Sequence, residues 1–248
     1  MVVRSDADVS FFLVGGYDVL GTLTSVRDKM EALTEESHTL GDSWVENLYT
    51  GIRKSEINQE GFYDDAANSV HEQLQSGLTL SRVLCYGLEG TATGAQFIGY
   101  AGALQISYEK VLTRGALHKA RADYRPAGRV DTGRLLRPQN PTTASGVAGS
   151  PIDNTVSSTN GGAGYLQLVS FASAALATGL QVAVQHSSDN ITYANLATFT
   201  SVTATTPTAE RIANAAGVVV ERYLRANSSF IGGAAGASAI YMVGYARY

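Results

Sequence analysis

The chain has little of what disulfide-stabilised, secreted or membrane-spanning proteins require. Among its 248 residues there is one cysteine, Cys85, so no disulfide can form within the chain. No apolar run approaches the roughly 20 residues of a membrane-spanning helix. The most hydrophobic N-terminal piece, residues 10–15, follows Asp6 and Asp8 instead of a basic segment. It therefore predicts neither a signal peptide nor membrane insertion.

Patterns typical of catalytic and metal sites are equally scarce. The four histidines are scattered, without a cysteine or carboxylate at the spacing of metal ligands: His38, His71, His118 and His186. Cys85, within the run SRVLCYGL, predicts a small buried strand residue and not a reactive thiol. The adjacent carboxylates Asp64 and Asp65 are explained by the N-terminus of a helix. We therefore expect no enzyme, no metal site and no cofactor.

Charge is unevenly distributed along the chain. Residues 1–138 hold 14 Lys and Arg against 18 Asp and Glu, whereas residues 139–248 hold only 4 of each class. Within the first part, residues 1–109 carry 6 basic and 16 acidic side chains, and residues 110–138 carry 8 basic and 2 acidic ones. An acidic body with a basic segment is complementary to a copy of itself, which predicts head-to-tail association.

Period-two patterns of apolar residues predict strands through most of the first half. These strands cover residues 8–15, 18–26, 43–49, 52–58, 78–88, 96–101 and 103–112. The clearest alternation places Leu104, Ile106 and Tyr108 on one face and Gln105 and Ser107 on the other. One switch to helical spacing follows Asp64 and predicts a single helix over residues 65–76.

Residues 113–138 contain most of the basic side chains and show no long period. They predict an extended irregular arm that lies on a neighbouring copy, with a solvated surface loop as the alternative. Nucleic-acid binding is a further possibility, because Tyr124 stands among seven cations: Arg114, Lys119, Arg121, Arg125, Arg129, Arg134 and Arg137. The acidity of the whole chain argues against that as its main role, since phosphate affinity needs an uncompensated basic face.

Residues 139–163 are rich in Pro, Gly, Ser, Thr and Asn and are almost uncharged, which predicts a linker. Short strands follow at residues 165–171, 180–186, 192–199, 209–212, 218–226 and 239–247, separated by turn clusters. Such spacing is typical of an antiparallel β-sandwich. We therefore predict two domains, residues 1–138 and 164–248, joined by this linker.

Three stretches of the first domain carry a resemblance to a known family. They are LGTLTSVRDKMEALTEESHTLGDSWVENLYTGIRKSEINQEGFYDDAANSVHEQL, SRVLCYGLEGTATGAQFIGYAGALQISYEK and RGALHKARADY. In pattern and order they resemble the major tail tube proteins of bacteriophages with long, non-contractile tails. The resemblance implies a mainly β fold, with an N-terminal tail-tube-type β-sandwich or barrel that carries one α-helix. It also implies hexameric rings that stack into the conduit for DNA ejection.

The second half resembles accessory domains of phage virion proteins, which are antiparallel β-sandwiches of the immunoglobulin-like or galactose-binding-like kind. The implied location is the virion tail, with assembly in the host cytoplasm. The implied partners are further copies of the chain, tape measure, tail terminator and distal tail proteins, and DNA that passes the lumen without sequence-specific binding.

Charge complementarity predicts which residues join the copies. The basic candidates are Arg114, Lys119, Arg121, Arg125, Arg129 and Arg134, and the acidic candidates are Glu35, Glu36 and Asp42. Two other functions stay open. A capsid decoration protein would share the outer sandwich and lack a lumen. A carbohydrate-binding virion module would use the tyrosines of the last domain: Tyr193, Tyr223, Tyr241, Tyr245 and Tyr248.

Overall fold

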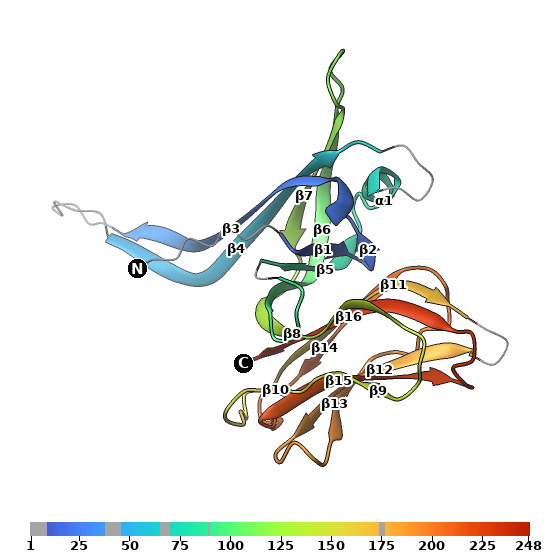
Figure 1. The fold of residues 1–248 in the computed structure, drawn as a ribbon. Helices are drawn as coiled ribbons and strands as arrows, with labels where there is room; N and C mark the ends of the chain where they lie inside the picture. The colour runs from blue at the N-terminus through green and yellow to red at the C-terminus, as the bar shows by residue number, and fades with distance from the viewer. Residues whose placement is uncertain (1–8, 38–45, 65–69, 89, 174–176) are drawn as a thin grey trace, which may run out of the picture. The chain divides into compact units, whose positions relative to one another are not determined.

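The computed structural model describes residues 9–37, 46–64, 70–88, 90–173 and 177–248 (Figure 1). The first half contains β1 (Phe11–Val14), β2 (Tyr17–Asp18), η1 (Leu20–Thr22), β3 (Leu23–Ser37), β4 (Glu46–Phe62), α1 (Val70–Ser76), β5 (Ser81–Gly87), β6 (Gln96–Val111), β7 (Lys119–Pro126) and β8 (Val130–Thr142). The second half contains β9 (Val147–Ala148), β10 (Ile152–Asp153), β11 (Gly162–Ala172), β12 (Gly179–Ser187), β13 (Ala194–Thr198), β14 (Thr208–Asn214), β15 (Tyr223–Ile231) and β16 (Ser238–Arg247). The predicted mainly β fold with one α-helix is confirmed for these ranges.

The chain forms two compact units, and each is assembled from separated pieces of sequence. The first unit comprises Met1–Gly21, Arg82–Gly102 and Gly128–Tyr248, and the second comprises Thr22–Ser81 and Ala103–Ala127. These units do not follow the predicted boundaries at residues 138 and 164. The reason is strand pairing, because β16 lies beside β8 from Ala239↔Thr142 to Tyr245↔Arg134. Local sequence patterns carry no information on such distant partners.

The segment predicted as a linker contains regular structure. Its first residues complete β8, while β9 and β10 both pair with β15. These pairings satisfy backbone N–H and C=O groups of the segment. The polar composition of the segment gave no sign of such pairing. Residues 139–163 are therefore part of the first unit and do not separate two domains.

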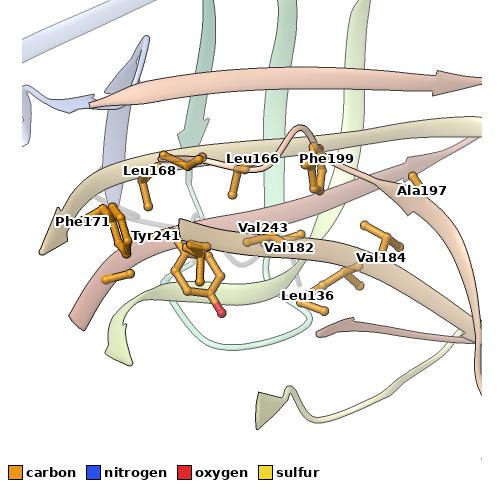
Figure 2. Packing of buried hydrophobic residues seen from close by; sticks show 14 of the residues in the cluster. Leu136, Leu166, Leu168, Phe171, Val182, Val184, Ala197, Phe199, Tyr241 and Val243 are labelled. Carbon is orange, nitrogen blue, oxygen red and sulfur yellow. The ribbon is translucent and has the colours of Figure 1, made fainter. Parts of the chain in front are cut away.

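Two sheets face each other in the first unit. The larger contains the strand order β14-β11-β16-β8-β6-β5-β1-β2, and the smaller has the order β10-β15-β12-β13 with β9 also on β15. Leu166, Leu168 and Val243 of the larger sheet meet Val182 and Val184 of the smaller one in a shared apolar core (Figure 2). This is the predicted antiparallel sandwich, extended by strands from the first half of the chain.

The larger sheet is buried on its other face as well. Leu135, Tyr165 and Met242 alternate with residues of the sandwich core and pack against Phe11 and Cys85 in a second cluster. Burial raises the pKa of the Cys85 thiol to about 12, so this thiol stays protonated and inert at neutral pH.

The Gln167 side chain makes hydrogen bonds between opposite ends of the larger sheet. Its side-chain oxygen accepts a hydrogen bond from the Gly16 amide at 2.7 Å, and its Nε2 donates to the Val83 carbonyl at 3.0 Å. Because Gln167 lies on β11 while Val83 lies on β5 and Gly16 beside β2, the sheet curls around the second cluster. A buried polar side chain of this kind is stable because it has partners.

The second unit is a twisted antiparallel sheet in the order β3-β4-β7-β6, with α1 against one face. The Gln105 side chain donates to the Leu74 carbonyl at 2.7 Å, and His71 Nδ1 contacts the Tyr108 hydroxyl. The predicted helix is confirmed at Val70–Ser76. Its predicted start at residues 65–69 lies outside the described residues.

Two local predictions about the first half of the chain were wrong. Residues 113–138 are not an irregular arm, because β7 buries Ala120, Ala122 and Tyr124 on one face and turns the charged residues between them to the other. Because alanine is only weakly apolar, its alternation with charged residues was not recognised as the pattern of a strand. In β6, a bulge between Gln105 and Ser107 exchanges the two faces of the strand. Gln105 is therefore buried, opposite Tyr124.

Candidate functional site

The longest exposed element of the second unit is the ribbon formed by β3 and β4. β7 pairs with β4 only from Ile57 to Phe62, so residues 46–56 of β4 have β3 as their single strand partner in the described part of the chain. β3 has β4 as its single strand partner there. Unpaired strand edges present rows of N–H and C=O groups to further strands. Figure 1 shows these two strands running together along their whole length.

The ribbon is bent where its register shifts between Ala32 and Thr34. Gly51 lies there with a φ of +83°, a conformation that glycine adopts without the steric cost of a Cβ atom. Across the irregularity, the Thr50 hydroxyl donates to the Leu33 carbonyl at 2.9 Å. Met30 and Leu33 are exposed at 59% and 40%. The ribbon thus carries apolar side chains that are only partly covered.

One face of the sheet is polar from the ribbon to β6. Its register places six cations on this face, Arg27, Lys29, Lys54, Lys119, Arg121 and Arg125, and five carboxylates, Glu31, Glu56, Glu60, Glu109 and Asp123. The two signs alternate between neighbouring strands and almost cancel. Phosphate affinity depends on uncompensated positive charge, so this face has little of it.

Ion pairs and hydrogen bonds fix the centre of the polar face. Glu60 accepts from Lys119 Nζ at 2.5 Å and from Arg121 Nε at 2.8 Å. These cations lower the pKa of the Glu60 carboxyl, with the Lys119 hydrogen bond as the largest cause. Asp123 accepts from Asn58 at 2.7 Å and from the Ser107 hydroxyl at 2.6 Å. A shallow hollow of about 390 Å³ is lined by Ser25, Arg27, Asn58, Gln59, Glu60, Ser107, Glu109, Arg121 and Asp123.

The opposite face of the sheet is apolar at its centre. Ile57, Ala122 and Tyr124 are fully or almost fully buried there, and the Tyr124 hydroxyl donates to Gln59 at 3.3 Å. α1 adds Leu74 to the same side. The apolar face therefore packs against α1, whereas the polar face is open to solvent.

The predicted contact residues are not gathered in one place. Lys119 and Arg121 lie in β7 and bind Glu60 of the same chain. In the first unit, Arg129 Nε lies 2.9 Å from Asp131, and Arg134 donates to the Gly94 carbonyl at 2.9 Å. Each of these four cations therefore has at least one partner within the chain, and their contact with a second copy stays a prediction.

Four other predicted residues remain accessible. Arg114 lies in the turn between β6 and β7 and is exposed, as are Glu35 and Glu36 on β3. Arg125 is exposed on the polar face. Asp42 lies outside the described residues, so its prediction is untested.

The tyrosines proposed for carbohydrate binding lie in three different environments. Tyr241 and Tyr245 are buried in the sandwich core, which is their structural role. Tyr223 on β15 and Tyr193 just before β13 are partly exposed. Each has an arginine near its ring: Arg225 lies 3.6 Å from the Tyr193 centroid and Arg222 lies 4.9 Å from the Tyr223 centroid. Tyr248 is stacked beneath Arg129 at 3.5 Å.

The pattern of charges missed the uncharged members of the polar face. Asn58 and Ser107 hold Asp123 in position, and neither stood out in the sequence. The signal that could have found them is the alternation Ala120, Ala122, Tyr124 within the basic segment, since it defines a strand whose other side is polar. Within the described ranges, no three His, Cys, Asp or Glu residues group as a metal site, and no helix is long and apolar enough to cross a membrane.

No protein-family model matches the chain, and no curated protein matches it. Among solved structures, the chain is similar to a protein in the tail of an empty gene transfer agent particle with C6 symmetry, at 15% identity, 48% coverage of this chain, 92% coverage of that chain and a TM-score of 0.36. It is also similar to the SPP1 Dit (gp 19.1) protein, at 11% identity, with 96% and 98% of the two chains covered and a TM-score of 0.35. A third similar structure is the anti-feeding prophage tube-terminating cap, at 14% identity, 53% and 93% coverage and a TM-score of 0.38. At these TM-scores the similarities do not establish a common fold.

Proposed function

We propose that the protein is a structural subunit of a phage tail, and that it forms the tail tube by association with copies of itself. The observation that carries the proposal is the open ribbon, whose β3 edge and β4 edge at residues 46–56 have no further strand partner within the described chain. The resemblance of the first half to major tail tube proteins supports the same function. No catalytic chemistry is part of this proposal.

Two free edges on one ribbon allow a closed ring. The β3 edge of one copy adds to the β4 edge of the next, and closure leaves neither edge of the ribbon exposed. The exposed Met30 and Leu33 side chains would be covered by the added strands. Six copies per ring, as the family resemblance implies, is the number that we propose.

Stacking of rings would use the two ends of the same sheet. Along β4, residues near its start pair with Glu35 and Glu36, and its last residue, Phe62, pairs with Lys119 beside the turn that holds Arg114. Acidic side chains thus stand at one end of the sheet and basic ones at the other. Head-to-tail stacking brings the two signs together.

The polar face is the surface that we propose for the lumen, because α1 covers the opposite face. Its charges are nearly balanced, and Glu60 and Asp123 hold their neighbours by hydrogen bonds. DNA would pass such a surface without a continuous row of free cations to bind its phosphates. The partners that we propose are tape measure, tail terminator and distal tail proteins, with the virion as the final location.

Electron microscopy of the purified chain tests this function directly. We expect rings or tubes from the parent protein at high concentration. The variant Met30→Lys places a charge at the ribbon and should remain folded by circular dichroism but stay monomeric. Ile191→Lys is the matched control, since Ile191 is 83% exposed in a turn of the first unit, and it should assemble like the parent.

Two results would reject the proposal in different ways. A parent protein that remains a monomer and binds to phage heads would favour the capsid decoration alternative. If Met30→Lys assembles as well as the parent, the ribbon is not the surface that joins the copies.

A further inference from the structure

A second hollow, of about 690 Å³, opens in the first unit beside β16. It is lined by Arg134, Ile152, Asp153, Asn154, Thr155, Val156, Ser157, Ser158, Arg247 and Tyr248. Its volume lies within the range of small-molecule sites, roughly 300–1,000 Å³. Of these residues, Arg134 alone was predicted from the sequence as a contact between copies, and the assembly proposed above does not use it.

Two arginines supply the charge of the hollow. Arg134 pairs with Tyr245 across β8 and β16, and Arg247 follows two residues later on the same face of β16. Each guanidinium makes one hydrogen bond to the main chain in the described structure: Arg134 to Gly94 at 2.9 Å and Arg247 to Val156 at 2.7 Å. A guanidinium has five N–H donors, so most of their donors are available.

The Nε atom of Arg247 is buried and has no acceptor among the described residues. A charged donor that is removed from water without an acceptor is costly. The same burial lowers the pKa of Arg247 from its ordinary value. An anion bound by the Arg247 guanidinium would favour its charged form.

The acidic group in the hollow does not neutralise these arginines. Asp153 binds the Arg222 guanidinium through both carboxylate oxygens, with Nε at 2.7 Å and Nη2 at 2.6 Å. The Tyr248 main-chain oxygen accepts from the Ser158 hydroxyl at 3.0 Å. Among the described residues, neither Arg134 nor Arg247 forms a salt bridge.

We propose that this hollow binds a small anionic ligand through a phosphate or carboxylate group held between Arg134 and Arg247. The planar fork of a guanidinium matches both kinds of oxyanion by paired hydrogen bonds. Ser157 adds a hydroxyl donor at the rim. This site is independent of assembly, so it stands or falls separately from the tail tube function.

Titration of the full chain with inorganic phosphate and, separately, with citrate tests the site. The readout is the Nε–H resonance of each arginine in nuclear magnetic resonance spectra. We expect Arg247 and Arg134 to shift on saturation with at least one of the two probes. Arg222, held by Asp153, and Arg125, in the second unit, should not shift. The probe that binds more tightly distinguishes a phosphate from a carboxylate ligand.

Substitutions make the assignment specific. Arg134→Gln and Arg247→Gln should each weaken binding by about tenfold or more, since each removes a charge-assisted contact. Arg125→Gln should bind like the parent. If Arg247→Gln unfolds because its hydrogen bond to Val156 is lost, anion binding by Arg134→Gln alone tests the site. No shift with either probe, or equal binding by Arg134→Gln and the parent, would overturn the site.

Discussion

Glu60 on β4 receives the Arg121 guanidinium of β7 at 2.8 Å, directly across the strand pair that joins these two residues. Lys119 binds the other carboxylate oxygen at 2.5 Å. The side chains are partly exposed, so solvent screens these pairs and each contributes little alone. Together they fasten the ribbon strand to the rest of the second unit.

Glu60→Gln should therefore lower the free energy of unfolding by about 1 kcal/mol, because it removes the charge that two cations share. Urea unfolding followed by circular dichroism measures this change. Glu109→Gln is the control, since Glu109 lies 3.8 Å from Arg121 and is more exposed, and it should change stability by less. Equal effects from the two substitutions would show that Glu60 has no special place in the sheet.

Opposite charges at the two ends of the sheet lead to a prediction about ring stacking. Reversal of Arg114 to Glu, or of Glu35 and Glu36 to Lys, should shorten or abolish tubes, because like charges would then meet. A mixture of the two reversed proteins should recover mixed assemblies. Electron microscopy and sedimentation measure both outcomes.

Arg125→Glu is the comparison for that experiment. Arg125 lies on the polar face and not at the end of the sheet, so its reversal should leave tube length unchanged. Reversal of Arg121 is a poor test, since it would also break the pair with Glu60. Normal tubes from both end-reversed variants would exclude stacking by these charges.

The sequence supported prediction of most strands and of the helix, because alternation and helical spacing are local signals. It did not support prediction of the units, because pairing of β16 with β8 joins residues about a hundred positions apart. Only some residues of the polar face could be predicted from the sequence. The charges of Lys119 and Arg121 stood out, but their partner Glu60 could be found only from the register of β4 and β7.

Tyr165 lies over a buried carboxylate in the first unit. Its hydroxyl donates to Asp131 at 2.5 Å, and Arg211 binds both residues, with Nε 3.1 Å from Asp131 and 3.0 Å from the Tyr165 hydroxyl. Tyr165→Phe should lower the free energy of unfolding by about 1.5–3 kcal/mol, the usual range for a hydrogen bond to a charged group. Tyr193→Phe is the control, because its hydroxyl binds Asn190 in an exposed turn. Thermal unfolding measures both variants. Equal losses of stability in Tyr165→Phe and Tyr193→Phe would contradict this role for Tyr165.

Alkaline titration should reveal the buried tyrosines by their late ionisation. Burial raises the pKa of Tyr108 to about 12 and raises the pKa values of Tyr165 and Tyr245 as well. A tyrosine in the unfolded chain loses its proton near pH 10, so the unfolded state releases protons first. Stability should be complete below about pH 10 and fall as the pH rises toward about 12.

Ultraviolet absorbance of tyrosinate, recorded together with circular dichroism, measures both events. Tyr108, Tyr165 and Tyr245 should ionise only as the fold is lost. Ionisation of all 13 tyrosines in one step near pH 10, with an unchanged circular dichroism spectrum, would contradict the burial described here.

The turn between β1 and β2 fits against β11 and β14 only because residue 16 has no side chain. Gly16 has a φ of +90°, and a Cβ atom there would stand 2.5 Å from both the Leu168 carbonyl oxygen and the Thr208 amide nitrogen. Gly217 has a similar φ of +94° with open space around it. Gly217→Ala should therefore cost about 1 kcal/mol of unfolding free energy through backbone strain alone. Gly16→Ala should cost about 2–5 kcal/mol, because the backbone of two strands must also move. Urea unfolding of the two variants compares these losses, and equal losses would mean that β1 and β2 do not pack against β11 as closely as described.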